Sequence, residues 1–187
     1  DIFPWNEHFN TGLITVDKQH KKLVQILNSL ASHIAYNSNE DDLNTIFEEL
    51  TNYTIYHFET EETIWHKYLP NDPLDKDHQA IHQQFVDTII KLKKEQKTRP
   101  LIELAEEALG FLARWLASHI LETDRFMAHL IFALRDGLNL DAAKQQAKEK
   151  MSGSSRILID IILSIYGTLS TNTLRLMREI KYHQNLE

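Results

Sequence analysis

The chain has 187 residues, with 20 basic against 27 acidic side chains and a net charge of −7. This length suits one domain with an appendage, and the charge argues against a nucleic-acid-binding protein, which needs a clustered basic face. The absence of cysteine excludes disulfides, thiolate metal sites and cysteine nucleophiles. Five glycines and four prolines are few for an all-β chain and favour helices.

Neither export nor membrane insertion is indicated by the sequence. The first residues lack the basic and apolar regions of a signal peptide. The most apolar stretch, residues 157–169, is short and contains Asp160. We therefore expect a cytoplasmic protein without a membrane span.

An arm over residues 1–16 precedes four predicted helices. Apolar residues recur at spacings of three and four from Asp17, and this period predicts helices over about 17–36, 40–67, 74–96 and 100–135. Asn37-Ser38-Asn39 ends the first helix and offers a cap for the second, Pro70 to Pro73 interrupt the chain, and Gly137 ends the fourth. Short connections force each helix against the previous one, which predicts an all-α, antiparallel up-down-up-down bundle over residues 1–136.

Residues 137–187 form a predicted helical extension. Asp141 is a candidate cap for a short helix to about Met151, and a longer helix follows over about 156–182. Its broad apolar face must be buried against the bundle, a partner helix or another subunit. The extension is thus a candidate linker or transmitter to an output domain, or a homodimerisation element, while simple packing on the bundle is an equally open alternative. The face comprises Ile157, Ile161, Ile165 and Leu169, with Leu158 and Ile162 beside them.

Histidine is the unusual residue, with ten in the chain, and some recur with carboxylates at helical spacings. Residues four apart lie on one face of a helix and can hold one site. Residues five apart differ by roughly 140° in an α-helix, so they approach a broad site from different sides or sit on a local bulge. The set is His20 on the first helix, His57 and Glu61 on the second, His78 and His82 on the third, and His119 and Asp124 on the fourth.

Five imidazoles and two carboxylates suit iron rather than calcium or magnesium. One histidine pair alone would be a weak indication, since most histidines on helices are surface or hydrogen-bonded residues. Four helices that each place such side chains in one bundle are a stronger indication of a metal site, because burying these polar groups without partners would cost several kcal/mol each. The other histidines have no such partners and are interpreted as ordinary: His8, His33, His66, His129 and His183.

With these motifs the chain resembles the bacterial hemerythrin domains over roughly residues 3–130. The seven-position ligand pattern of that family is complete, although His66 and Lys67 stand where an apolar stretch is expected, and the resemblance leaves out residues 137–187. The residues that carry it are Pro4-Trp5, Ile14-Thr15-Val16-Asp17-Lys18-Gln19-His20, His57-Phe58-Glu59-Thr60-Glu61-Glu62, His78 with His82, and Trp115-Leu116-Ala117-Ser118-His119 through Asp124.

The resemblance implies a non-haem diiron site, with two iron ions (Fe²⁺/Fe³⁺) joined by a bridging oxo or hydroxo group. It assigns His20 and His57 to one iron, three histidines to the other, and Glu61 and Asp124 to both. Two six-coordinate irons have about twelve positions, and this set with the bridge fills all but one. The open position lies on the iron with two histidines. The three histidines of the other iron are His78, His82 and His119.

Around this site, the spacing and the resemblance predict four walls of a ligand pocket. Each wall is equally well explained as ordinary bundle core. Asp17 and Asp75 precede ligand histidines by three residues and are candidates for orienting an imidazole, although a solvated acid at a helix start explains them better. The predicted walls are Leu23, Phe58, Trp115 and Leu116.

The expected function is reversible dioxygen binding or redox sensing, as the sensory domain of a larger signalling protein, with nitric oxide as a second candidate ligand. Dioxygen storage or delivery is the main alternative, and the extension weighs against it. A diiron oxidase, peroxidase or nitric oxide-handling enzyme is less favoured, because diiron oxidases use carboxylate-rich sets with Glu-x-x-His pairs. No catalytic residue is predicted in this region. A metal-free bundle is the remaining alternative.

Overall fold

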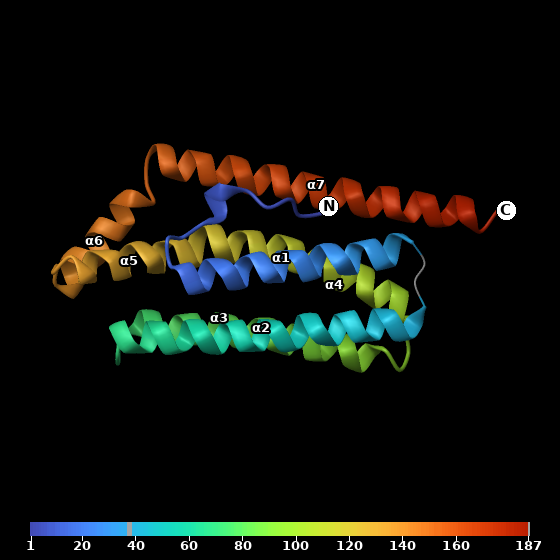
Figure 1. Ribbon diagram of the computed structural model, residues 1–187, viewed down its shortest axis with the longest axis horizontal. Helices are drawn as coiled ribbons and strands as arrows, with labels where there is room; N and C mark the ends of the chain where they lie inside the picture. Colours follow the sequence, from blue (N-terminus) through green and yellow to red (C-terminus); the bar gives the residue numbers. More distant parts are fainter. Residues whose placement is uncertain (37–38, 187) are drawn as a thin grey trace.

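The computed structural model describes residues 1–36 and 39–186, and over these the secondary structure is helical (Figure 1). A short 3-10 turn lies in the arm, and a π-helical segment separates two α-helices in the second half of the chain. The predicted cap residues Asn37 and Ser38 lie outside the described residues. In chain order the elements are η1 Glu7–Phe9, α1 Ile14–Ala35, α2 Glu40–Tyr68, α3 Pro73–Glu95, α4 Leu101–Ser118, the π-helix η2 His119–Asp124, α5 Arg125–Arg135, α6 Leu140–Lys150 and α7 Ser154–Gln184.

The first four α-helices form a closed bundle. α1 packs on α2 and α4, and α3 packs on the same two helices. The connections 69–72 and 96–100 are short, so consecutive helices run side by side in opposite directions (Figure 1). The predicted four-helix bundle with C-terminal helices is therefore confirmed.

The starts of α2, α3 and α6 are fixed by side chains that bond free backbone N–H groups. The Asn39 side chain accepts from the Asp42 N–H at 2.8 Å, and Asp72 accepts from the Leu74 N–H at 2.9 Å. At α6 the prediction was wrong: the cap is Asn139, not Asp141. Asn139 has an extended backbone and accepts from the Ala142 N–H at 2.8 Å, which leaves Asp141 inside the first turn.

α1 begins three residues earlier than predicted, at Ile14 rather than Asp17. Asp17 therefore lies within the first turn of the helix. There its carboxylate accepts hydrogen bonds from the Thr11 N–H at 2.7 Å and the Gly12 N–H at 3.0 Å. The turn at Gly12 has φ +95°, a conformation that glycine adopts without strain. Asp17 thus holds the arm against the first helix.

The N-terminal arm is clamped between the bundle and α7 (Figure 1). The Asn28 side chain of α1 bonds both the N–H and the carbonyl of Phe3, each at 2.9 Å. The Tyr166 ring of α7 lies 4.8 Å from the Phe3 ring and 5.0 Å from the Phe9 ring, and its hydroxyl donates to the Pro4 carbonyl. Both phenylalanines are fully buried, so the arm is part of the main core.

A second core closes the other end of the bundle. It joins α5 and α6 to the start of α1 and the end of α2 around the buried Trp65. α6 contributes Ala143 and Ala147, whose small side chains let it pack closely on α5. The two cores thus extend into α6 and α7, while the predicted domain boundary after residue 136 stays a prediction.

α7 leaves most of the predicted apolar face exposed, and of that face Ile162 and Leu169 are half-buried. Ile157, Ile161 and Ile165 are 63%, 50% and 57% exposed, and Leu158 is exposed as well. The helix instead packs on α4 and α1 through the stripe of Ile159, Tyr166, Ser170 and Met177. One reason lies in α4: Gly110 has no Cβ, and Leu174 Cδ1 of α7 comes within 3.0 Å of where a Cβ would stand.

The outward face of α7 therefore remains apolar and exposed. By length and composition alone this helix could cross a membrane, a weak criterion that core helices of soluble proteins also meet. Contact of this face with a second copy or an output domain, and the absence of a membrane span, stay predictions.

Replacing Tyr166 by alanine tests the docking of α7. Tyr166 is 8% exposed and packs on two phenylalanines, so its loss should lower the free energy of unfolding by about 2–4 kcal/mol. Tyr182→Ala is the matched control, because Tyr182 is 65% exposed on the same helix and should change stability by less than ~0.5 kcal/mol. Urea unfolding measures both. Equal losses in the two variants would contradict this packing.

Candidate metal centre

All seven predicted ligand side chains are buried and converge at one place in the bundle. Their donor atoms form two groups, in each of which all atoms lie within 4.8 Å of one another. Glu61 belongs to both groups. The first group is His20, His57, Glu61 and Asp124, and the second is Glu61, His78, His82 and His119.

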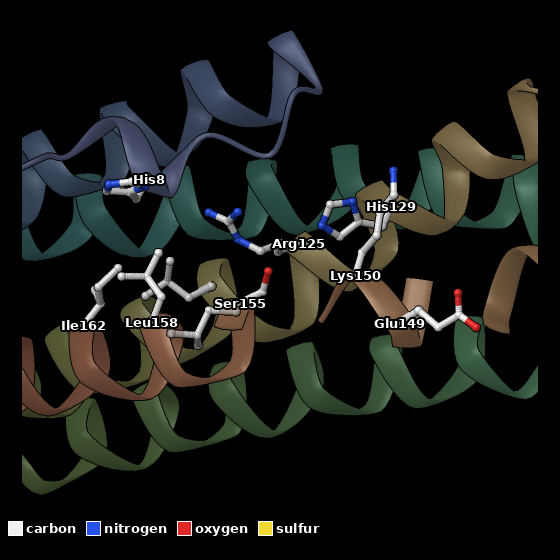
Figure 2. Close-up of a pocket in the computed structure, with 10 residues that line it drawn as sticks. His8, Arg125, His129, Glu149, Lys150, Ser155, Leu158 and Ile162 are labelled. Atoms are coloured by element: carbon white, nitrogen blue, oxygen red, sulfur yellow. The ribbon is translucent and has the colours of Figure 1, made fainter. Parts of the chain in front are cut away.

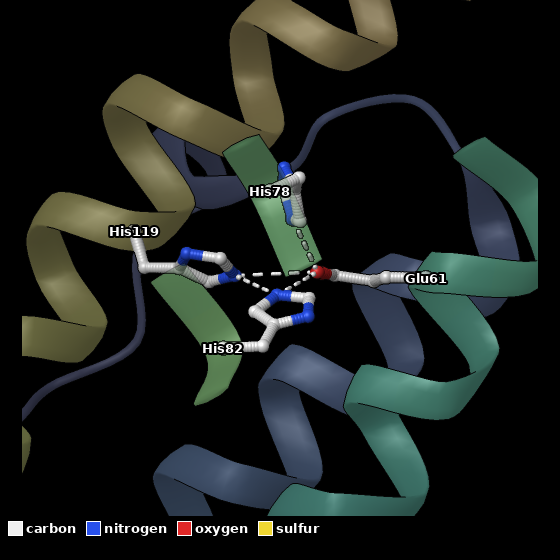
Figure 3. Close-up of side chains that lie close together, drawn as sticks. All are labelled: Glu61, His78, His82 and His119. Atoms are coloured by element: carbon white, nitrogen blue, oxygen red, sulfur yellow. Dashed lines mark hydrogen bonds and ion pairs between the residues drawn. The ribbon is translucent and has the colours of Figure 1, made fainter. Parts of the chain in front are cut away.

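The Glu61 carboxylate lies between the two groups. Its Oε1 lies 3.1 Å from His20 Nε2 and 2.7 Å from His57 Nε2. Its Oε2 lies 3.1 Å from His82 Nε2 and 3.2 Å from the Nε2 atoms of His78 and His119, as Figure 3 shows. Each oxygen therefore serves one group, which is the arrangement of a bridging carboxylate.

Asp124 also contacts histidines of both groups. Its Oδ2 lies 2.8 Å from His20 Nε2 and 3.1 Å from His119 Nε2. Its Oδ1 lies 3.4 Å from His78 Nε2. Asp124 is thus a second carboxylate, in addition to Glu61, that connects histidines of α1, α3 and the π-helical segment.

The π-helix explains the spacing of five residues between His119 and Asp124. These two residues are the first and last of η2. A π-helix bonds residue i to residue i+5, so residues five apart lie about one turn above each other. The bulge thereby brings both side chains to one face, and of the two sequence interpretations the local bulge is correct.

Three donor atoms of the site lack the hydrogen bonds that buried polar atoms normally make. His57 Nε2 and both oxygens of Asp124 are buried and have no hydrogen-bond partner with acceptable geometry among the described residues. Buried polar atoms in native proteins are almost always hydrogen-bonded. These three atoms instead approach their charged neighbours at ion-pair distance without hydrogen-bond geometry, as donor atoms that point at a common cation would. Imidazole with carboxylate is a donor set that suits iron.

The protonation of the histidines reflects these contacts. Burial disfavours charge on His20 and His119, but Asp124 and Glu61 outweigh it and raise the pKa of His20 to about 9 and that of His119 to about 10. For His82 burial prevails and lowers the pKa to about 4. Burial alone would raise the pKa of Glu61, yet His57 and His119 hold it well below its usual range. A metal must therefore displace protons from His20 and His119, because only neutral imidazole binds.

Two residues that sequence reasoning missed orient the histidines from outside. The Gln19 amide donates to Thr60 Oγ1 at 3.1 Å, which turns its oxygen toward His57 Nδ1 at 2.7 Å. Glu62 Oε1 accepts from His82 Nδ1 at 3.2 Å. In both histidines Nδ1–H donates outward, so Nε2 faces the centre. The sequence offered one indication of this role, because each of these residues is next to a predicted ligand in the chain.

The two acids proposed to orient imidazoles have other partners. Asp17 holds the arm, as described above. Asp75 pairs with His66 Nδ1 at 2.9 Å and is buried, so it is neither an orienting group nor a solvated acid. His66 itself is mostly exposed. The histidine in the last turn of α2 is thus a partner for a buried carboxylate.

Two of the four predicted pocket walls stack on histidines of the second group. The Phe58 ring stacks on His82 with centroids 3.8 Å apart, and the Trp115 ring stacks on His119 at 4.4 Å. Leu23 and Leu116 are buried in the same core. The aromatic walls therefore cover the three-histidine side, whereas the open position was expected on the two-histidine side.

The pKa values predict how the metal-free protein responds to pH. In the folded state His20 and His119 keep protons that the unfolded chain loses above its pKa of 6.5. Their stabilisation is complete below pH 6.5 and disappears as the pH rises through 9 and 10. Chemical unfolding from pH 6.5 to 10 should show this decline, and His119→Gln should flatten it. His33→Gln, outside the site, is the control, and parallel curves for all three proteins would refute the assignment.

Comparison with known proteins agrees with this geometry. The model of the family described as "Hemerythrin HHE cation binding domain" matches residues 11–131. Bacteriohemerythrin of Pseudomonas aeruginosa (strain LESB58) is 31% identical over 121 residues, which cover 64% of this chain and 75% of that protein. Bacteriohemerythrin of Clostridium acetobutylicum is 29% identical over 129 residues, 66% of this chain and 97% of that protein. Hemerythrin-like protein of Naegleria gruberi is 26% identical over 122 residues, covering 65% and 87%. The chain belongs to the hemerythrin family.

Proposed function

We propose that this chain binds dioxygen reversibly at a non-haem diiron centre and reports the state of that centre to the rest of a signalling protein. The observation that carries the proposal is the pair of donor groups that share Glu61. His20 and His57 would hold one iron, and the second group the other, with Glu61 and Asp124 spanning both. When bound, the diiron pair supplies two electrons and one open position for a small molecule.

The protein's own task is to keep the donor atoms fixed and dry. Gln19 and Glu62 set the orientation of two imidazoles. Phe58 stacks on one of these, His82, and Trp115 stacks on His119. A small, water-excluding interior admits a diatomic molecule and disfavours larger substrates and side reactions.

The donor set favours a binding protein over an enzyme. Diiron oxidases of the ferritin-like bundles use carboxylate-rich sets with Glu-x-x-His pairs. Here five histidines meet two carboxylates, and His57 and Glu61 follow the spacing His-x-x-x-Glu. Such a set leaves one position open, which supports binding of dioxygen, with nitric oxide as the alternative ligand.

Sensing rather than storage is supported by a direct link between the site and α7. Glu122 lies in the π-helix between His119 and Asp124, and its Oε1 accepts from Arg156 Nη2 in α7 at 2.6 Å. Both side chains are more than a third exposed, so the pair adds little stability. Its importance is geometric, because a shift of the π-helix would be passed to the start of α7. A storage protein has no need of this connection.

Iron content and the visible spectrum test the diiron proposal. We expect about two irons per chain, near-ultraviolet oxo-bridge bands that bleach with dithionite, and their recovery in air. A transient oxygenated form would favour binding, and immediate oxidation would favour redox sensing. Glu61→Ala should lose both irons, because Glu61 serves both groups. Glu59→Ala, on the exposed side of α2, is the control. Absence of iron after anaerobic ferrous reconstitution would overturn the proposal.

Hydrogen exchange tests the sensing link. Exchange in the first turns of α7 should differ between the oxidised and reduced protein, and Arg156→Gln should abolish the difference while leaving iron content unchanged. Arg178→Gln is the matched control, because Arg178 is an exposed residue of the same helix that pairs with Glu106 of α4. If exchange in α7 ignores the redox state in the unsubstituted protein, storage becomes the better interpretation.

A further inference from the structure

A cavity of about 350 Å³ lies apart from the donor set, where α5, the end of α6, the start of α7 and the arm meet (Figure 2). This volume is in the range of small-molecule sites. Its walls divide into a polar part and an apolar part. The polar lining residues are His8, Arg125, His129, Glu149, Lys150 and Ser155, and the apolar ones are Leu121, Leu158, Ile159 and Ile162.

The centre of the polar part is an unpaired guanidinium group. Arg125 is partly buried, and its Nε is fully buried without a hydrogen-bond partner among the described residues. Asp17 is the acid whose charge acts on it, but that carboxylate is engaged by Thr11 and Gly12. A buried cation is normally paired. The Arg125 side chain lines the cavity and is a cation that an anion there could pair with.

The other charged groups of the cavity reinforce this positive character. Lys150 is a second cation in the lining. The pKa of His129 is lowered by burial and then by the charges of Lys150 and Arg125. Glu149 is the carboxylate among the lining residues, and in Figure 2 it lies on the far side of the cavity from the Arg125 guanidinium. Arg125 and Lys150 are thus the cations of the lining, and the lowered pKa of His129 favours its neutral form.

The start of α7 adds further donors. Ser155 lies in the first turn of this 31-residue helix, whose cap residue Gly153 has no side chain to satisfy the first N–H groups. These groups and the helix dipole favour an anion. Figure 2 shows Arg125 above the α7 side chains Ser155, Leu158 and Ile162. Polar donors and an apolar surface thus face the same space.

We propose that this cavity binds a small organic anion. A carboxylate or phosphate group would lie between Arg125, Lys150 and Ser155, and a short apolar chain would pack on Leu158 and Ile162. The bound anion would tie α5 to α7 immediately after Asp124. The site uses none of the seven metal-centre residues, so it stands independently of the proposed diiron function.

Calorimetric titration of the full chain with hexyl phosphate tests the site. We expect a Kd of roughly 100 µM, given the ligand's size. Inorganic phosphate lacks the chain and should bind at least ~10-fold more weakly, and hexanol lacks the charge and should not bind detectably. Sedimentation with vesicles of phosphatidic acid, reversed by hexyl phosphate, would identify the source of the anion as a lipid headgroup. Retention in solution would identify a free metabolite.

Substitutions locate the binding. Arg125→Gln should weaken hexyl phosphate binding by at least ~10-fold, because it removes the central donors. Since Arg125 adjoins Asp124, Lys150→Gln provides a second variant outside the core, with an expected loss of about threefold. Lys148→Gln, on the same helix but outside the cavity, should stay within ~2-fold. No heat with the unsubstituted protein, or equal affinity in all three variants, would overturn the proposal.

Discussion

The structure depends on one constraint: seven polar side chains occupy the interior of a helical bundle, where water cannot solvate them. Loss of water makes such a cluster unfavourable unless its atoms form ion pairs and hydrogen bonds with one another. Glu61 does most to meet this condition, because its two oxygens contact histidines of different groups. Asp124 and Glu61 raise the pKa values of His20 and His119 by the same contacts. A pair of cations would take the place of those protons, so the two carboxylates favour either kind of positive charge at this position.

The π-helix is the local irregularity that this site requires. It gives His119 and Asp124 a common direction and places Glu122 on the outer surface between them. The residue that follows it, Arg125, faces the cationic cavity. One segment therefore connects the metal centre, the start of α7 and the proposed anion site.

The C-terminal helices are bound to the bundle through different chemistry. α6 packs by small alanine side chains, whereas α7 packs by aromatic contact with the arm and by close approach at Gly110. The outward stripe of α7 keeps its apolar residues exposed. One face of α7 is thus anchored on the bundle and the arm, and much of the opposite face is exposed.

The sequence by itself determined the helices, the bundle and the seven converging residues, because helical periodicity and the spacing of ligand pairs are local properties. Packing alone decided which stripe of α7 is buried, since Ile157, Ile161 and Ile165 were the more apolar choice and yet face outward. It also decided that Asn139 rather than Asp141 caps α6, and that Gln19 and Glu62 orient histidines across the bundle. Such contacts join residues far apart in the chain, or depend on one turn of backbone geometry, and neither leaves a periodic signal in the sequence. The resemblance supplied the ligand assignment, and the fold supplied the reason that Glu61 can serve both groups.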